Sequence, residues 1–137
     1  MDSRTTQSLE SLLESYDFHP ECLNEMFDCI VGSGCEVEFY RQFKHITGIL
    51  RELGIDATKN KNFEKLKNAG NLYSMKIKTK RLNLRIIYTY KNRKLALLLC
   101  TFHERSDSKD TYKKYIPVAQ KRITEMEEEK WHIIKRI

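Results

Sequence analysis

The stretch LYSMKIKTKRLNLRIIYTYKNRKLALLLCTFH, residues 72–103, decides the fold. Near its start, the apolar residues Tyr73, Met75 and Ile77 alternate with polar ones, which predicts a half-buried strand. A second alternating segment covers 84–90, and a third, at 94–103, is apolar on both faces as in the middle of a sheet. Short polar connections separate the three segments, so we expect an antiparallel meander.

Helical spacing precedes this meander. An apolar stripe at positions 9, 12, 13 and 16 predicts a helix over 5–18, which His19–Pro20 should interrupt. Further stripes predict helices over 20–31 and 36–53, and a Gly-Ser-Gly turn joins them into a helical hairpin. A polar stretch with one helical turn at Phe63–Lys67 leads to the first strand of the meander.

A linker rich in Ser, Asp and Lys, residues 104–110, follows the meander and leads to a final helix. Pro117 either marks the true start of this helix or kinks it. The buried stripe is expected to comprise Tyr112, Ile116, Ala119, Ile123 and Met126. The last residues, around Trp131, are more apolar than a free tail needs, so we expect part of the tail to pack on this chain or on a partner.

These patterns predict an α+β fold. N-terminal helices and a helical hairpin pack on a small antiparallel β-sheet of three to four strands, and a helix closes the chain. We divide the chain into an acidic N-terminal helical extension at 1–19, a main domain at 20–126 and a C-terminal helical tail at 127–137.

Length and composition limit the class of protein. The chain has 137 residues, which is room for one domain, and 40% of them are hydrophobic, which is enough for a core. The longest apolar run is far short of the roughly 20 residues that a membrane helix needs, and the N-terminus shows no secretory signal. We therefore expect a cytoplasmic protein with no membrane partner.

The net charge of +6 is unevenly distributed. Residues 1–40 contain one basic and nine acidic residues, whereas residues 41–122 contain 21 basic and six acidic ones. A central block this basic is typical of proteins that bind polyanions, although a solvated basic surface gives the same composition.

The cysteines do not predict a metal site. His19, Cys22, Cys29 and Cys35 carry donor atoms for zinc, but their spacing does not match known zinc motifs. In the cytoplasm such cysteines are typically small buried residues or free thiols. We expect no metal and no cofactor.

The candidate site is a group of cations on adjacent strands. Alternation places Lys76, Lys78 and Arg85 on the same face of two antiparallel strands, opposite the apolar face. Like charges this close destabilise a sheet unless an anion lies between them, so the pattern indicates a phosphate site. For Lys78 and Lys80, protection of a sheet edge against aggregation is an equally good explanation.

The third strand ends in His103, Glu104 and Arg105. A histidine exchanges protons near neutral pH, although one at a strand end more often has a structural role. Its position next to Arg105 and the basic strands makes His103 the best candidate for proton transfer.

Four short motifs, in order, resemble the RelE/ParE superfamily of bacterial toxins, and most of all its HigB-type branch. They are Leu72-Tyr73-Ser74-Met75-Lys76-Ile77, Leu84-Arg85-Ile86-Ile87-Tyr88, the apolar strand ending in Phe102, and Ala119 with Arg122 in the last helix. The chain departs from the family pattern at Ser74, where a glutamate is usual, and at Lys76, where an arginine is usual. The turn after Phe102 is His103-Glu104-Arg105-Ser106 instead of a run of lysines. The family's first strand, expected before the helical hairpin, has no clear counterpart.

The resemblance implies a RelE-like toxin domain over 20–126. It implies an endoribonuclease that cleaves mRNA on the ribosome without a metal, through attack of the 2′-hydroxyl, and that a cognate antitoxin neutralises. On this basis Lys76 and Arg85 stabilise the phosphoryl transition state, His103 transfers a proton and Arg105 contacts phosphate. Lys78, Lys80 and Arg81 hold the RNA backbone, and Tyr88 or Tyr112 stacks on a base, unless these tyrosines are core residues.

Two other functions fit the same sequence. One is the ParE-type role in the same superfamily, in which the protein poisons DNA gyrase and has no nuclease site. The other is a non-catalytic binding or regulatory module that uses the acidic N-terminal region and the tail around Trp131.

Overall fold

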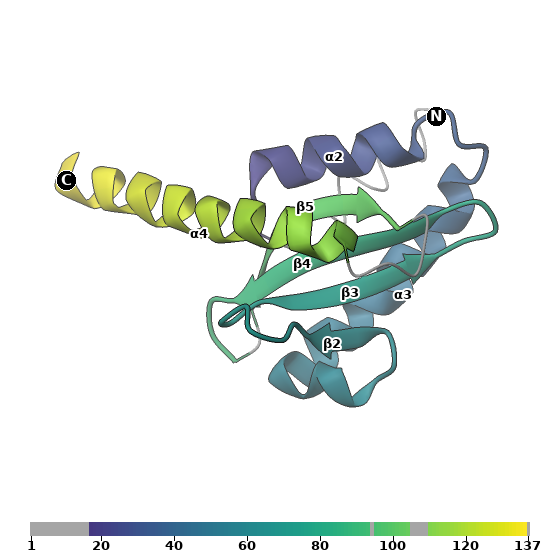
Figure 1. Cartoon of the computed structure of the whole chain (residues 1–137), viewed down its shortest axis with the longest axis horizontal. Helices are drawn as coiled ribbons and strands as arrows, with labels where there is room; N and C mark the ends of the chain where they lie inside the picture. The colour runs from purple at the N-terminus through teal and green to yellow at the C-terminus, as the bar shows by residue number, and fades with distance from the viewer. Residues whose placement is uncertain (1–16, 94, 105–109, 137) are drawn as a thin grey trace.

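A computed structural model describes residues 17–93, 95–104 and 110–136 of the chain (Figure 1). The elements are β1 (Asp17–Phe18), α2 (Pro20–Ile30), α3 (Glu36–Leu53), the 3-10 helix η1 (Gly54–Lys59), β2 (Phe63–Lys65), β3 (Tyr73–Lys78), β4 (Asn83–Tyr90), β5 (Ala96–His103) and α4 (Asp110–Arg136). The predicted α+β class and the predicted helical hairpin are confirmed. None of the described helices is long and apolar enough to cross a membrane.

The predicted meander forms the centre of the sheet. Strands β3, β4 and β5 pair antiparallel in sequence order, and their bounds match the alternating segments of the sequence. The register breaks once, between Ile87 and Tyr88, where Leu99 of β5 is left without an opposite residue. Leu99 is therefore the extra residue of a β-bulge.

Two short strands complete a five-stranded mixed sheet in the order β1-β5-β4-β3-β2. The predicted helix over 5–18 is wrong at its end, because Asp17 and Phe18 pair parallel with Leu97 and Leu98. The rest of that helix, residues 1–16, lies outside the described residues. Since β1 is two residues long, the sequence shows no period from which it could be predicted.

The predicted helical turn at Phe63–Lys67 is also wrong. Residues 63–65 form β2, which pairs antiparallel with β3 at the other edge of the sheet. Phe63 is buried whereas Glu64 and Lys65 are exposed, so one apolar side chain anchors a strand that is otherwise polar. Three residues are too few for alternation to distinguish a strand from a turn.

The helices cover both faces of the sheet (Figure 1). Buried residues of α2 and α3, among them Met26 and Phe43, pack with Leu84, Ile86 and Tyr88 of β4 in one core cluster. A second cluster joins α4 to the opposite face and contains Ile87, Cys100, Phe102 and Ala119, with the flanking stripe of Tyr112, Ile116, Ile123 and Met126. The predicted stripe of the last helix is thus confirmed.

Helix α4 starts at Asp110 and includes Pro117, so the helix does not begin at the proline. It continues to Arg136 and runs past the end of the sheet (Figure 1). The side chains from 128 onward lie outside the described residues, so the predicted packing of the tail around Trp131 stays a prediction.

One partly buried ion pair closes the edge of β5 where β1 ends. The guanidinium of Arg122 donates to both carboxylate oxygens of Glu25, at 2.7 and 2.9 Å, and to the carbonyl of Leu99 at 2.9 Å. The same Glu25 carboxylate accepts from the backbone N–H of Thr101 at 3.1 Å. Burial on its own lowers the pKa of Arg122, but the bond to Glu25 outweighs it and the pKa is raised. The pair therefore joins α2 and α4 through backbone groups of β5 that no neighbouring strand satisfies.

We predict that Arg122→Ala lowers the free energy of unfolding by about 2–4 kcal/mol, because it leaves the Glu25 carboxylate and the backbone carbonyl of Leu99 without their donor. Urea denaturation measures the change. The matched control is Lys121→Ala, which removes a neighbouring but exposed cation of α4 and should change stability by less than about 0.5 kcal/mol. Equal effects of the two substitutions would contradict the role given to Arg122.

Candidate nucleic-acid interface

Lys76 of β3 and Arg85 of β4 are direct register partners in the middle of the sheet. Both side chains are half-buried and face the side that α4 covers, because Ile87, two residues after Arg85, belongs to the α4 cluster. Directly opposed residues of an antiparallel pair have their Cβ atoms about 5 Å apart. The sequence prediction that these two cations share one face is confirmed.

No carboxylate neutralises this pair within the described part of the chain, since none of its four ion pairs includes Lys76 or Arg85. The guanidinium of Arg85 donates to the side-chain oxygen of Asn83 and, at 3.4 Å, to the carbonyl of Leu84. These neutral acceptors orient the arginine without cancelling its charge. One carboxylate, Glu64 on β2, lies opposite Ser74 and acts on Tyr112, but it forms no ion pair with Lys76 or Arg85. Two adjacent cations without an ion-pair partner create a positive potential that favours an anion.

Tyr112 extends from the first turn of α4 over these strands. Its hydroxyl lies 2.8 Å from the hydroxyl of Ser74, and its ring contacts the edge of Phe102, the register partner of Arg85 on β5. Burial raises the pKa of Tyr112, and the bond to Ser74 and the charge of Arg85 oppose this only in part. The phenol is therefore protonated at neutral pH and can donate a proton next to the two cations. The sequence predicted a stacking or core role for Tyr112. Its contact with β3 was not predictable, because Ser74 and Tyr112 are 38 residues apart.

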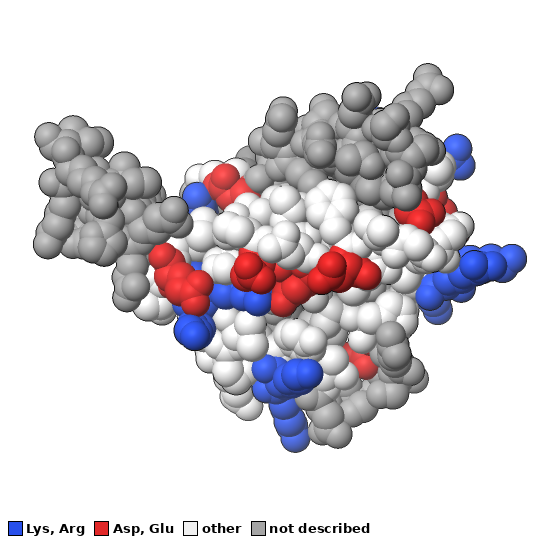
Figure 2. Space-filling model, turned by 90° about the horizontal axis from the view of Figure 1, so that it is seen from above, with Lys and Arg blue, Asp and Glu red and all other residues white. Residues whose placement is uncertain are grey.

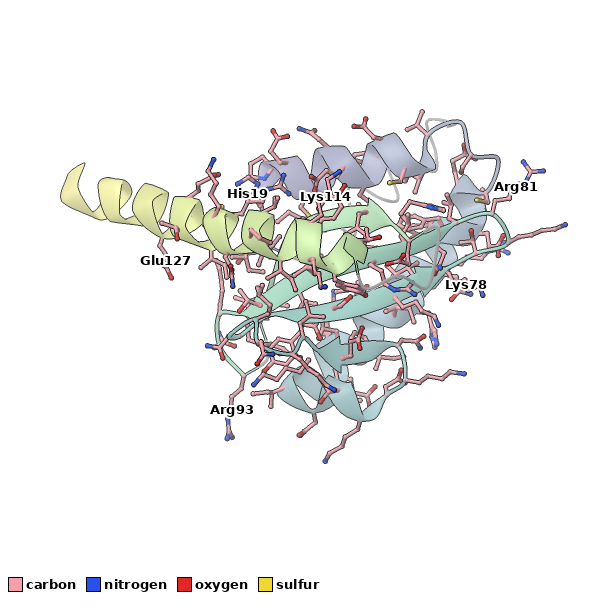
Figure 3. The ribbon with its side chains drawn as sticks, viewed as in Figure 1. His19, Lys78, Arg81, Arg93, Lys114 and Glu127 are labelled. Atoms are coloured by element: carbon pink, nitrogen blue, oxygen red, sulfur yellow. The ribbon has the colours of Figure 1, made fainter. Side chains whose placement is uncertain are left out.

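The three cations assigned to the RNA backbone follow the same hairpin outward, and Figure 3 shows Lys78 and Arg81 along it. Lys78 is exposed and lies two residues beyond Lys76, so it has the same face. Lys80 and Arg81 are exposed at the turn; the backbone N–H of Lys80 donates to Glu38, and Arg81 donates to the carbonyl of Ser33 at 3.4 Å. Gly34, at φ +82°, allows this approach, since a Cβ there would lie 2.9 Å from the arginine. The turn is thus attached to the helical hairpin while Lys78 and Lys80 stay in solvent.

His103 is not brought to this site. It pairs with Leu84, whose side chain belongs to the α2–α3 face, and not with Asn83. The cause is the bulge at Leu99, since an unbroken register would set His103 opposite Asn83 on the face of Arg85. The ring nitrogen Nε2 accepts from the backbone N–H of Asn83 at 3.3 Å, whereas Nδ1 is buried without a hydrogen-bond partner. The structure therefore places the predicted proton donor away from Lys76 and Arg85, and Arg105 lies outside the described residues.

Cysteine chemistry does not contribute to the site. The thiols of Cys22 and Cys100 are buried, which raises the pKa of Cys22 and raises that of Cys100 to about 12. Both are protonated at neutral pH and are poor nucleophiles. Among the described residues, no three His, Cys, Asp or Glu side chains come together as a metal site.

The surface above α2 has a different charge from the candidate site. Seen from above, it shows a row of acidic side chains, and the basic ones lie mainly at its rim (Figure 2). Helix α2 contributes Glu21, Glu25 and Asp28 and has no basic residue. A polyanion would be repelled here, which favours the sheet face with Lys76 and Arg85 as its binding surface.

Comparison with known families gives one match. The family described as phage derived protein Gp49-like (DUF891) matches residues 34–124, which span 91 of the 137 residues and include all the site residues described above. No curated protein is similar enough to match the chain.

We predict that the pKa of Tyr112 lies above the ordinary tyrosine value of 10, because burial disfavours its phenolate. The raised pKa also implies that Tyr112 stabilises the fold up to about pH 10 and that this contribution is lost as the pH rises further. NMR of ¹³C-labelled tyrosine, with Tyr112→Phe as the assignment control, measures the pKa. Ser74→Ala should raise it further, and an ordinary value in the parent protein would contradict the site geometry.

Proposed function

The chain belongs to the phage-derived Gp49-like family, a family of RelE-type toxins from toxin–antitoxin systems, and on this premise we propose that it is an endoribonuclease. The substrate in this proposal is mRNA on the ribosome, as in the HigB-type branch, and an antitoxin is the neutralising partner. The observation that supports the proposal is the pair Lys76 and Arg85, two adjacent half-buried cations with neutral hydrogen-bonding neighbours.

The pair suits the charge that develops when RNA cleaves itself. The 2′-hydroxyl attacks the adjacent phosphorus, the bond from phosphorus to the 5′-oxygen breaks, and a 2′,3′-cyclic phosphate and a 5′-hydroxyl result. Negative charge gathers on the non-bridging oxygens in the transition state. Fixed cations in a partly buried site stabilise that charge more than cations in open water do.

Two protons must also move. The 2′-hydroxyl loses its proton to solvent, and the leaving 5′-oxygen gains one. Tyr112 is the donor in this proposal, since its buried phenol is protonated and lies over the row of Arg85 and Phe102. Tyr112 takes the role predicted for His103, whose Nε2 accepts from the backbone N–H of Asn83.

The exposed cations give the RNA a path to the site. Lys78 and Lys80 lie on the hairpin between β3 and β4, next to the buried pair. Exposed lysines bind phosphates without sequence preference and with an affinity that falls as salt rises. Selection of a cleavage position is therefore left to the bases near Tyr112 and to the ribosome.

We predict that Lys76→Ala and Arg85→Ala each slow RNA cleavage by about 10²–10³-fold, because each removes a fixed donor to the transition state. The measurement is the rate of mRNA cleavage on translating ribosomes, with product ends identified as cyclic phosphate and 5′-hydroxyl. Arg93→Ala is the control, since it removes one exposed positive charge at the opposite hairpin, between β4 and β5 (Figure 3).

The same variants test the proposal in cells. Expression of the parent without an antitoxin should arrest bacterial growth, and the double variant Lys76→Ala, Arg85→Ala should not. Growth arrest by the parent with intact mRNA would contradict the nuclease and favour the gyrase-poisoning role. Full toxicity of the double variant would show that the site lies elsewhere.

A further inference from the structure

The C-terminal part of α4 extends beyond both the family domain and the sheet. The family match ends at residue 124, whereas the helix continues to Arg136. Glu125 accepts from His19 at 2.9 Å, and Met126 packs on the core cluster. We call residues 125–129 the root and residues 130–137 the tip of this extension.

A groove lies beside the root. It has a volume of about 930 Å³ and apolar walls from Leu72, Leu97, Ile123 and Met126, with Lys91 and Glu127 among its polar lining. Figure 3 shows Glu127 on the side of α4 that faces this part of the molecule. The groove is far along α4 from Tyr112, so it does not belong to the candidate site.

The apolar stripe that packs α4 on the sheet continues into the tip. Its positions 116, 119, 123 and 126 follow alternating spacings of three and four residues, and the same spacing reaches 130, 133 and 137. These are Lys130, Ile133 and Ile137, which is the repeat of a short coiled coil with one polar position. Beyond the sheet, an apolar stripe stabilises the helix only if another surface packs against it and buries it.

The charges of the extension are separated along its length. The root contains Glu125, Glu127, Glu128 and Glu129 and no basic residue, whereas the tip contains Lys130, Lys135 and Arg136 and no acidic one. Within the extension, only Glu127 and Lys130 form a Glu–Lys or Glu–Arg pair at a spacing of three or four residues, the spacings that bring charges together inside one helix. Opposite charges are therefore arranged for contacts between two helices more than within one.

We propose that two copies of this chain pair through antiparallel α4 extensions, with the apolar tip of each copy in the groove beside the root of the other. An antiparallel arrangement brings the acidic root against the basic tip twice, once on each side of a two-fold axis. Such an interface is isologous and closes as a dimer. The groove, the continued stripe and the divided charges support a second copy as the occupant, and none of them depends on the proposed nuclease activity.

Sedimentation velocity of the full chain over a range of concentrations tests the pairing. An interface this small is typical of weak association, so we expect a Kd on the order of micromolar. Root reversal, Glu127→Lys with Glu129→Lys, sets two basic segments against each other. Tip reversal, Lys135→Glu with Arg136→Glu, does the same with acidic segments. Each reversal should raise the Kd at least tenfold.

A mixture of the two reversed variants tests the proposed charge pairing most directly. A root-reversed chain and a tip-reversed chain have complementary charges at both contacts, so the equimolar mixture should form a heterodimer of nearly parental affinity. Thermal melts of each variant confirm that it is folded, and RNA cleavage should be unchanged. A monomeric parent, association only with an antitoxin, or a dimer that neither reversal weakens would overturn the proposal.

Discussion

The structure depends on how the free edge of β5 is closed. β1 covers only two residues of this strand, and beyond them the bulge at Leu99 leaves backbone groups that no strand can satisfy. Glu25 and Arg122 bind these groups and each other, which fixes α2 and α4 to the sheet and to one another. Because ten residues of helix span about 15 Å, the position of Arg122 also determines where Tyr112 lies over Lys76 and Arg85.

The distribution of charge follows from this arrangement. The acidic residues of α2 lie along the edge of the sheet, and one of them, Glu25, is used by Arg122. Arg85 lies on the next strand inward and Lys76 on the one after it, and neither forms an ion pair within the described residues. An unpaired cation pair destabilises a sheet, and an arriving phosphate relieves that repulsion. The fold thus gives up some stability at the position where we propose that a phosphate binds.

Much of this fold is predictable from the sequence because its larger elements have clear periods. The alternation at 73–78 and the stripes at 20–30 and 36–53 identify β3, α2 and α3 almost to the residue. The edge strands β1 and β2 are not predictable in this way, since two or three residues cannot show a period and form only against their neighbours.

The site was predictable up to the bulge. Alternation within β3 and β4 places Lys76 and Arg85 on one face, and the register agrees. Alternation along β5 predicts the wrong face for His103, because the extra residue at Leu99 shifts the register by one. A bulge cannot be recognised in this strand from the sequence, because its residues are apolar on both faces. The contact of Tyr112 with Ser74 joins residues 38 positions apart, so only the fold reveals it.

The central claim is that Lys76 and Arg85 hold an RNA phosphodiester, and the salt dependence of RNA binding tests it most directly. Affinity for a short single-stranded RNA with 2′-O-methyl groups, which cannot be cleaved because the attacking hydroxyl is blocked, is measured at several salt concentrations. The parent is compared with the double variant Lys76→Gln, Arg85→Gln. The account predicts that the slope of log K against log salt becomes shallower by about 1.4 in the variant, at about 0.7 per lost phosphate contact on a single strand. An unchanged slope would contradict it.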